Sequence, residues 1–501
     1  MTEEQLQNES KPKRTRILGK QTVVTVVGSK TNIINIQEPL IKSIAEFANE
    51  LGLEIYIVGG YVRDYYLHRP RIDYDFTIIG DAIEFAEKLA QKFYTKPILY
   101  PRFRTAMVQI NGTKCEFVGT RKEIYQHNSR NPIVTEGTLE DDLKRRDFTI
   151  NSMAVSLNDQ KFGEVIDVFG GIRDLGLKIL RTPLNPMITF NDDPLRMLRA
   201  IRFASQLDFR IDSNAYNVIK KISERIQIVS QERITEEFLK VLASPKPSLG
   251  LNLLFDTTLL RYIFPELYFL AGVEKVFDKG IEYAHKDIFM HTLQVVDNVA
   301  KQSDNIWLRF AALVHDIAKP KTKQFIPEIG WSFHGHEELG ARMMDGIFRR
   351  MRLPLEHLEF VTKLVRLHQR PMALVDEGVT DSAVRRLAFH AGDALDDLFL
   401  LCKSDITTNN PKIGEKYLRN YDFVAKKVKE VQEKDKLKEF QSPVRGDEIM
   451  KICNIEPSPL VGMIKSAIEE AILDGIVPNE YESAKAYFLE NKDEWLKQFS
   501  N

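Results

Sequence analysis

The stretch that decides the fold reads Gly59-Gly60-Tyr61-Val62-Arg63-Asp64, and Asp73-Tyr74-Asp75 follows nine residues later. The apolar run 55–58 predicts a short buried strand, so the paired glycines mark a strand-to-helix turn where the backbone can approach a ligand closely. The amides of such a turn, with the positive end of the next helix, can hold a phosphate group. Arg63 can add a forked, charge-assisted contact, so the stretch predicts phosphate binding.

Two aspartates, Asp73 and Asp75, stand two residues apart in the strand-like run 72–79. Side chains at positions i and i+2 share one face of a strand, so both carboxylates can reach the same point. Two carboxylates beside a phosphate site are what magnesium-dependent phosphoryl chemistry requires. Either pattern alone would favour ordinary turn chemistry, because paired glycines and Asp-x-Asp are both common.

Together, the glycine turn and the aspartate pair resemble the opening of a nucleotidyltransferase of the DNA polymerase beta superfamily. The resemblance is greatest to the class II CCA-adding enzymes and the related bacterial poly(A) polymerases. It implies an α+β protein, in which a small α/β catalytic head precedes an all-helical neck and tail. It also implies that Gly59, Gly60 and Arg63 bind the nucleotide, and that Asp73 and Asp75 hold Mg²⁺.

A third carboxylate is expected from the same sheet. The segments 107–110 and 114–118 flank Asn111-Gly112 and predict a hairpin, because Asn-Gly is the strongest short turn signal. Glu116 lies among apolar neighbours in the second strand, where a carboxylate is normally disfavoured. The alternative is that Glu116 faces the surface of the sheet. Because the aspartate pair is already present, we predict that Glu116 is a third catalytic carboxylate. The following segment 120–125 also resembles the family.

The segment Arg145-Arg146-Asp147-Phe148-Thr149-Ile150-Asn151-Ser152-Met153-Ala154 resembles the second signature of that family. Arg145 and Arg146 offer forked donors for phosphates, and Asp147 offers an acceptor for ribose hydroxyls. A basic doublet is usually a solvated surface, but the ten-residue match favours a nucleotide site.

A third signature, at residues 192–202, predicts a helix that reads the base. Pro194 behind an acidic pair, with strong helix formers after it, indicates a helix N-terminus. Asp193 and Arg196 are three residues apart and can project together. Cytosine and adenine present an amino donor beside a ring-nitrogen acceptor, and uracil and guanine present the reverse. An aspartate beside an arginine therefore selects CTP and ATP.

An ordinary salt bridge at a helix N-terminus is the alternative for this pair. Arg199 and Arg202 follow on the same helix and are also assigned to nucleotide binding. The segment 231–238 resembles the last neck motif of the family, and we expect it to brace the reading helix.

A second constellation of histidines and aspartates is spread over several predicted helices: His291, His315, Asp316, His336, His368 and Asp405. Imidazoles with carboxylates suit a phosphohydrolase that uses a transition metal. The order His…His-Asp…Asp resembles an HD domain, which implies that this set binds a divalent transition metal, with His336 and His368 as extra ligands. It also implies phosphatase or 2′,3′-cyclic phosphodiesterase activity, and the alternative is a retained fold without hydrolase activity. We expect the other histidines nearby, at positions 285, 334 and 357, to be core or surface residues.

The composition suits a chain of several domains, with 501 residues that are 43% hydrophobic and 28% charged. No apolar run is long enough to span a membrane, and the polar start lacks a signal-peptide core. Cys115, Cys402 and Cys453 are dispersed, which suits a reducing cytoplasm. The net charge of −1 excludes a globally basic nucleic-acid binder, so bound tRNA would require local patches such as the arginines of 196–202. The basic run 11–16 is interpreted as a solubilising tail.

Composition and the order of the motifs predict a chain of five parts. They are an N-terminal tail (1–35), a nucleotidyltransferase head (36–160), a helical neck with the base-reading helix (161–275), an HD domain (276–415) and a helical tail that binds tRNA (416–501).

The function that follows is template-independent addition of CMP and AMP, from CTP and ATP, to the 3′ end of tRNA. The enzyme is expected to be cytoplasmic, magnesium-dependent, and a monomer or a dimer, with phosphohydrolase activity in its HD domain. A poly(A) polymerase and a CC-only or A-only adding enzyme remain as alternatives. A further alternative is an HD phosphohydrolase whose head only binds RNA. The presence of Asp73, Asp75 and Glu116 argues against it, because a domain that only binds RNA need not keep a metal site.

Overall fold

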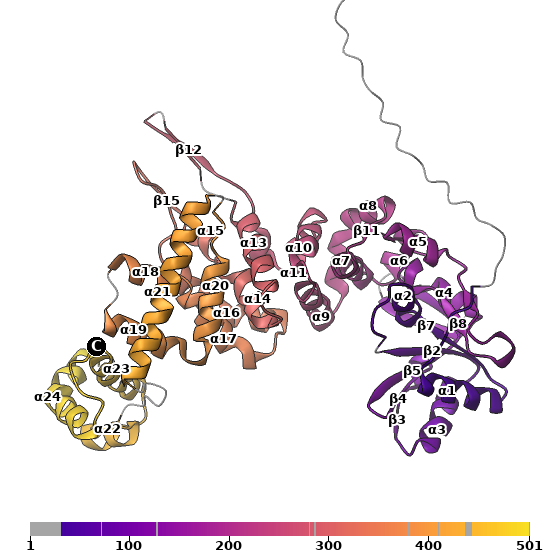
Figure 1. Ribbon diagram of the computed structural model, residues 1–501, viewed down its shortest axis with the longest axis horizontal. Helices are drawn as coiled ribbons and strands as arrows, with labels where there is room; N and C mark the ends of the chain where they lie inside the picture. The colour runs from indigo at the N-terminus through magenta and orange to yellow at the C-terminus, as the bar shows by residue number, and fades with distance from the viewer. Residues whose placement is uncertain are drawn as a thin grey trace, which may run out of the picture.

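The protein is elongated, with a sheet-containing head at one end and a small helical bundle at the other (Figure 1). This computed structural model describes residues 32–499 except 72, 127–128, 280, 285–286, 378–379, 409 and 436–442. The basic run 11–16 and His285 lie outside the described residues. The predicted fold class, an α/β head followed by a helical region, is confirmed.

The head is built on a seven-stranded sheet with the strand order β3-β4-β5-β2-β1-β8-β9. Only β2 and β5 are parallel, and the other neighbouring strands are antiparallel. The strands are β1 (Glu54–Val58), β2 (Tyr74–Ile79), β3 (Pro97–Tyr100), β4 (Thr105–Ile110), β5 (Thr113–Gly119), β8 (Ala154–Ser156) and β9 (Val165–Ile166).

The predicted hairpin is confirmed, because β4 and β5 pair across Asn111 and Gly112. These two residues have φ angles of 50° and 81°, as a two-residue turn matched to the strand twist requires. The run at 55–58 is also a buried strand, as predicted. The run at 72–79 forms a strand only from Tyr74, so Asp73 stands directly before β2.

Four helices and one further hairpin complete the head: α1 (Pro39–Glu50), α2 (Gly60–Tyr66), α3 (Ala82–Lys92), α4 (Leu139–Lys144) and the pair β6 (Arg121–Gln126) and β7 (Ser129–Glu136). Helix α1 buries Ile41, Ile44, Ala45 and Ala48, which lie on one face at helical spacing. Helix α3 packs on the sheet through Phe85, whose ring centroid is 5.3 Å from that of Phe117.

The head extends beyond its expected limits in both directions. Ile34 and Ile36 are buried in its core, and Ile33 forms a bridge with Glu164. Because β9 pairs with β8, the sheet continues to Ile166, past the expected boundary at residue 160.

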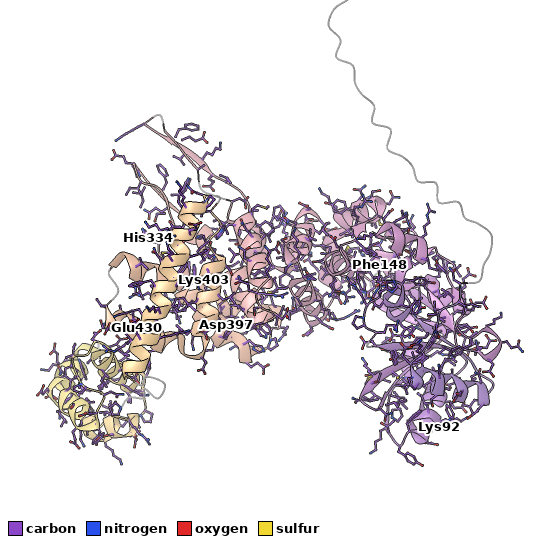
Figure 2. The ribbon with its side chains drawn as sticks, viewed as in Figure 1. Lys92, Phe148, His334, Asp397, Lys403 and Glu430 are labelled. Carbon is purple, nitrogen blue, oxygen red and sulfur yellow. The ribbon has the colours of Figure 1, made fainter. Side chains whose placement is uncertain are left out.

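The neck is helical and joins the head to the HD domain. Phe148 lies where head and neck meet (Figure 2), and its ring contacts Phe203 edge to face with centroids 5.9 Å apart. The neck elements are α5 (Gly171–Leu177), β10 (Ile179–Leu180), α6 (Pro186–Asp192), α7 (Leu195–Leu207), β11 (Arg210–Ile211), α8 (Ser213–Ile222), α9 (Gln231–Leu242), α10 (Pro247–Asp256), α11 (Leu259–Ile263) and α12 (Pro265–Tyr268).

The HD region is a helical bundle from which two hairpins project (Figure 1). The hairpins are β12 (Lys275–Asp278) with β13 (Ile281–Ala284), and β14 (Gln324–Ile326) with β15 (Gly330–Ser332). The helices are α13 (Ile288–Ala300), α14 (Ile306–Val314), α15 (Lys319–Thr322), α16 (His336–Met351), α17 (Leu358–Leu367), α18 (Arg370–Glu377), α19 (Asp381–Ala391), α20 (Leu395–Ser404) and α21 (Pro411–Asp435).

Arg309 connects the HD region to the neck. Its buried guanidinium donates to the carbonyls of Leu242 and Ser244 at 3.3 and 3.1 Å, and to the carbonyl of Ala300 at 3.3 Å. A buried cation satisfied by carbonyls from both sides holds the two parts in one orientation.

The C-terminal bundle has a core of its own. It contains α22 (Gly446–Cys453), α23 (Pro459–Leu473) and α24 (Tyr481–Phe499), which bury Val444, Ile449, Ile464, Ile468 and Phe488. Arg386 of α19 forms ion pairs with Asp474 and Glu470 and so connects this bundle to the HD region. Among the described residues no helix combines the length and the apolar character that a membrane crossing needs.

Candidate functional site

The three predicted carboxylates line one head cavity of about 650 Å³. Asp75 on β2 and Glu116 on β5 are register partners in the parallel pair, so their side chains stand on the same face. Burial, and then the charge of Glu116, raise the pKa of Asp75 to about 6. Asp73 is exposed at the mouth of the cavity. Carboxylates crowded in this way fit a divalent cation with oxygen ligands.

Gly59 makes the strand-to-helix turn that the sequence predicted. Its φ of 71° favours glycine, and a Cβ at this position would stand 2.9 Å from Arg146 Nη1. The amide of Gly59 donates to the carbonyl of Met153 at 3.1 Å, so this amide is not available to a phosphate. Gly60 begins α2 and lines the same cavity.

Arg63 reaches the cavity from α2 and is held in place by two neighbours. It donates to both carboxylate oxygens of Asp64, at 2.9 and 2.7 Å, and to Asn151 Oδ1 at 2.9 Å. Asn151 also donates to Asp147 Oδ1 at 3.0 Å. This chain of contacts orients Arg63 before any ligand is present.

Asp147 lines the same cavity, and its carboxylate is held by neighbouring side chains. Its carboxylate accepts from Arg199 Nη2 at 2.6 Å and from the Phe148 amide at 2.8 Å. Burial would raise the pKa of Asp147, but Arg199 and Asn151 lower it to about 2. The carboxylate is therefore ionised and already engaged, and it positions Arg199 on α7.

Arg145 and Arg146 line the cavity as predicted, and they share one buried partner that the sequence analysis did not identify. Arg145 donates to Asp142 Oδ1 at 2.5 and 3.0 Å, and Arg146 donates to Asp142 Oδ2 at 3.0 Å. Asp142 is the last of three consecutive acidic residues on α4, and nothing in that run marks it as the buried one.

Asp193 and Arg196 both line the cavity at the start of α7. Asp193 Oδ1 accepts from the amide of Leu195 at 3.1 Å, which fixes the carboxylate at the beginning of the helix. Arg196 donates to the carbonyl of Arg145 at 2.6 Å. The structure thus brings the predicted base-reading pair to the cavity that holds the three carboxylates.

Helix α9 contacts the base-reading helix through charged side chains. Arg233 lies 3.4 Å from Asp193, and buried Glu237 lies 3.2 Å from Arg202 Nη1. Arg202 is itself buried, and it lines the cavity. These contacts agree with the bracing role expected of residues 231–238.

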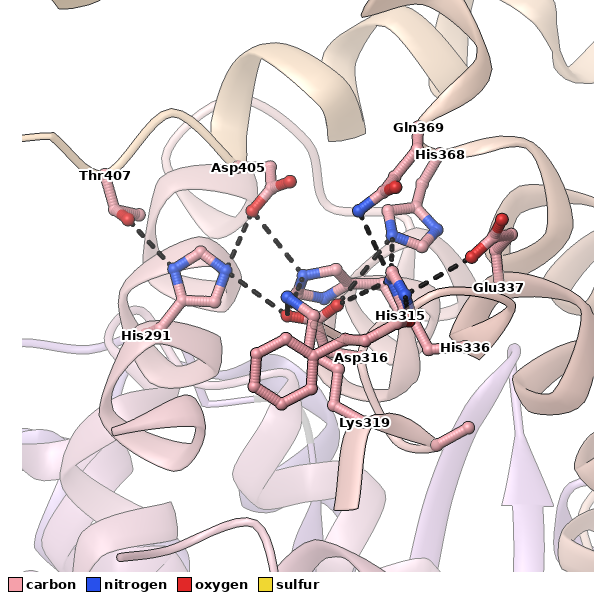
Figure 3. Close-up of polar contacts among 12 residues, drawn as sticks. His291, His315, Asp316, Lys319, His336, Glu337, His368, Gln369, Asp405 and Thr407 are labelled. Carbon is pink, nitrogen blue, oxygen red and sulfur yellow. Dashed lines mark hydrogen bonds and ion pairs between the residues drawn. The ribbon is translucent and has the colours of Figure 1, made fainter. Parts of the chain in front are cut away.

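A second site, in the HD region, gathers all six predicted residues (Figure 3). His291, His315 and Asp405 form one group, and Asp316, His336 and His368 form another. Asp316 belongs to both, because Oδ2 lies 3.2 Å from His315 Nε2 and Oδ1 lies 3.2 Å from His336 Nε2. One carboxylate therefore faces two sets of ligands.

Each histidine presents Nε2 to the centre, because its Nδ1 is engaged elsewhere. The Nδ1 atoms of His315, His336 and His368 donate to the carbonyls of Ala312, Phe333 and Val365 at 2.8, 2.8 and 2.7 Å. His291 Nδ1 lies 2.9 Å from Thr407 Oγ1. A carbonyl can only accept, so the protons of these three rings are at Nδ1, and Nε2 is left as a metal ligand.

Two buried atoms of this centre suit a cation site. His315 Nε2 and Asp316 Oδ1 are buried without hydrogen-bond partners in the described part of the chain. The Nε2 atoms of His336 and His368 lie only 3.3 Å apart, and both are acceptors when Nδ1 carries the proton. A bound cation would satisfy both acceptors.

The pKa values of two buried histidines shift in opposite directions. Burial lowers the pKa of His315, but Asp316 outweighs it and raises the pKa to about 10. Burial and then the charge of His315 lower the pKa of His368 to about 4. Asp316 therefore favours a positive charge beside it, which suits a cation site.

The centre opens into a cavity of about 1150 Å³. The side chains of His291 and Asp405 are partly exposed, at 15% and 28%, while His315 and Asp316 are buried. Lys319 lines the cavity with its ammonium group 2.6 Å from Asp316 Oδ2. As expected, His334 and His357 lie outside the centre, and His357 stacks on Trp307 at 4.2 Å.

Three family profiles match consecutive parts of the chain. The poly A polymerase head domain matches residues 55–181, a segment described as the probable RNA and SrmB-binding site of polymerase A matches residues 208–270, and the HD domain matches residues 288–388.

Individual relatives match over different lengths. An A-adding tRNA nucleotidyltransferase of Aquifex aeolicus is 43% identical over 169 residues, which is 34% of this chain and only 20% of that protein. A multifunctional CCA protein of Xanthomonas campestris pv. campestris is 32% identical over 366 residues, or 70% of this chain and 85% of that protein. A crystal structure of a tRNA nucleotidyltransferase complexed with a primer tRNA and an incoming ATP analog has a TM-score of 0.55 at 25% identity, covering 77% of this chain and 99% of that one.

Proposed function

Because this chain belongs to the family of CCA-adding enzymes, we propose that it adds CMP and AMP, from CTP and ATP, to the 3′ end of tRNA. One observation carries the proposal: a single cavity holds Asp73, Asp75 and Glu116 beside Asp193 and Arg196. The same cavity thus combines groups for phosphoryl transfer with groups that can read a base.

The three carboxylates would hold Mg²⁺, which supplies activation of the tRNA 3′ hydroxyl and neutralises the triphosphate. The arginines around the cavity bind and orient the triphosphate, since Arg63 and Arg146 already stand in fixed positions. The reaction joins the 3′ oxygen to the α-phosphorus and releases pyrophosphate. Catalysis is therefore mainly positioning and charge stabilisation.

Base choice is assigned to Asp193 and Arg196. An aspartate accepts from the amino group of cytosine or adenine, and an arginine donates to the ring nitrogen beside it. Uracil and guanine would place a carbonyl against the carboxylate, and a mispaired buried polar group costs about 1–3 kcal/mol. The amide of Leu195 fixes Asp193 for this role.

We expect Asp193→Ala and Arg196→Ala to lose discrimination against UTP and GTP, by roughly tenfold or more for a penalty of this size. Incorporation from equal mixtures of the four nucleotides measures the effect. Arg210→Ala is a matched control, because Arg210 is an exposed arginine of the neck that does not line the cavity. Unchanged selectivity in both variants would assign base reading to another pair.

One assay separates CCA addition from the alternatives. We expect a tRNA that lacks its last three nucleotides to gain two C residues from CTP and one A from ATP. An A-adding enzyme, like the Aquifex relative by its name, would extend only a tRNA that already ends in CC. A poly(A) polymerase would add many A residues, and a CC-only enzyme would stop before A.

The pKa of Asp75 predicts a pH dependence. It is raised from 3.8 to about 6, first by burial, so the carboxyl is protonated below this pH and cannot hold a cation. We expect CMP incorporation at limiting Mg²⁺ to fall as the pH drops through about 6, and higher Mg²⁺ to shift the midpoint to lower pH. A midpoint that does not respond to Mg²⁺ would contradict the assignment.

The raised pKa of Asp75 also makes the free energy of unfolding depend on pH. This free energy falls with rising pH, whereas the activity rises. The folded carboxyl binds its proton more tightly than the unfolded one, so the metal-free protein loses stability as the pH rises from about 4 to about 6.

For the HD centre we propose metal-dependent hydrolysis of a phosphoester. The two ligand groups that share Asp316 fit two divalent transition ions, because neutral imidazole prefers such ions to magnesium. Ions bound there supply an activated water. Lys319 stands beside Asp316 and faces the cavity, where its ammonium can bind the substrate phosphate.

A further inference from the structure

We propose that Asp142 is a positioning residue for the triphosphate, and that it holds Arg145 and Arg146 with their guanidinium groups toward the head cavity. The proposal rests on nucleotidyl transfer as the function of the head. Asp142 belongs to none of the sequence motifs described above.

The two carboxylate oxygens of Asp142 accept from two different arginines. Oδ1 accepts from Arg145 at 2.5 and 3.0 Å, and Oδ2 accepts from Arg146 at 3.0 Å and from the Thr77 hydroxyl at 3.3 Å. The side chain of Asp142 is 0% exposed. Burial would raise its pKa, but the two arginines lower it to about 2, so the carboxylate is ionised.

Arg146 is held by Asp142 and still lines the cavity. Asp142 accepts from Nη2 of Arg146 at 3.0 Å, and the same guanidinium lines the cavity with the three carboxylates. A guanidinium carries five donors, so one carboxylate engages only part of it. The remaining donors can bind oxygens of the triphosphate.

Arg146 also stands near the catalytic carboxylates. Arg146 Nη1 and Asp75 Oδ2 lie 2.9 and 3.9 Å from the point where a Cβ on Gly59 would stand. Asp142 engages Nη2 of the same guanidinium, so it competes with Asp75 for the positive charge of Arg146.

Asp142 is not needed to stabilise the N-terminus of helix α4. The N-terminus of α4 is capped by Thr138 and Asp141, which form a reciprocal capping box. A buried ion pair adds little stability compared with apolar side chains of the same volume. The contacts of Asp142 run to the two arginines and to Thr77, so its carboxylate serves the arrangement of the cavity wall.

The test compares nucleotide binding in Asp142→Asn with that of the wild-type full-length protein. We expect the KM for CTP and for ATP to rise by about tenfold and by the same factor, because both nucleotides share the triphosphate. Equilibrium binding of CTP and ATP without tRNA should weaken in the same ratio, and selectivity against UTP and GTP should stay unchanged. Asp141→Asn is the matched control on the same helix turn, and it should leave KM unchanged because the side-chain hydrogen bonds of Asp141 within the described residues go to Thr138.

A second variant keeps the test decisive if Asp142→Asn does not fold. Asp142→Glu retains the negative charge. It should raise the KM values for CTP and ATP less than Asp142→Asn does, because the charge still holds the arginines. A lower kcat with unchanged KM and unchanged nucleotide binding in the folded variants would overturn the proposal, since it would indicate a stabilising role only. A wild-type protein that binds CTP and ATP but adds neither to tRNA would instead contradict the proposed function.

Discussion

Asp75→Ala should abolish nucleotide addition, with a fall of about a thousandfold or more in the rate of CMP and AMP incorporation. Asp75 is the register partner of Glu116 and lines the same cavity as Asp73, so its loss disrupts the carboxylate group. Asp73→Ala should have a similar effect. The measurement is incorporation of labelled CTP and ATP into tRNA that lacks its 3′ end.

Two controls separate catalysis from folding in this experiment. Glu84→Ala removes an exposed carboxylate of the head that pairs only with Lys88 on α3, and it should leave addition unchanged. The metal content of the HD centre should also be unchanged in Asp75→Ala, because that centre belongs to a different part of the chain. Near-normal activity in either aspartate variant would refute the assignment of the head as the catalytic site.

The second large effect is expected in the HD centre. His315→Ala combined with Asp316→Ala should remove bound metal and phosphoester hydrolysis while nucleotide addition stays largely intact. Asp316 faces both ligand groups, so its loss affects both at once. The double change also removes a buried charge together with its partner, which avoids an unpaired charge in the core. Metal analysis of protein purified without chelator, with hydrolysis of a 2′,3′-cyclic phosphate, measures the outcome.

His334→Ala is the matched control for this centre. His334 is exposed and stands two residues before His336, so a histidine is lost without a ligand. Metal content and hydrolysis should both persist in this variant. If the wild-type protein carries no metal and hydrolyses no phosphoester, the HD region is a scaffold and the proposed hydrolase function is wrong.

Local patterns in the sequence were sufficient for the turns, the strands and the sites that follow them. Asn111-Gly112 makes the predicted hairpin because its two residues adopt positive φ readily, and this requires no distant partner. Gly59 and the strand before it obey similar local rules. The six HD residues were predicted from the resemblance to an HD domain, and the structure brings all six together.

Which partner each charged side chain takes was decided only by the tertiary structure. Three acidic residues in a row begin α4, and packing against the sheet buries Asp142 alone under the two arginines. Asp147 pairs with Arg199, which α7 brings to within 2.6 Å. Asp316 faces two ligand groups because helices α13 and α16 approach it from opposite sides. Turn chemistry and strand alternation act between neighbouring residues, whereas ion pairs form between residues that only the packing of distant helices and strands brings together.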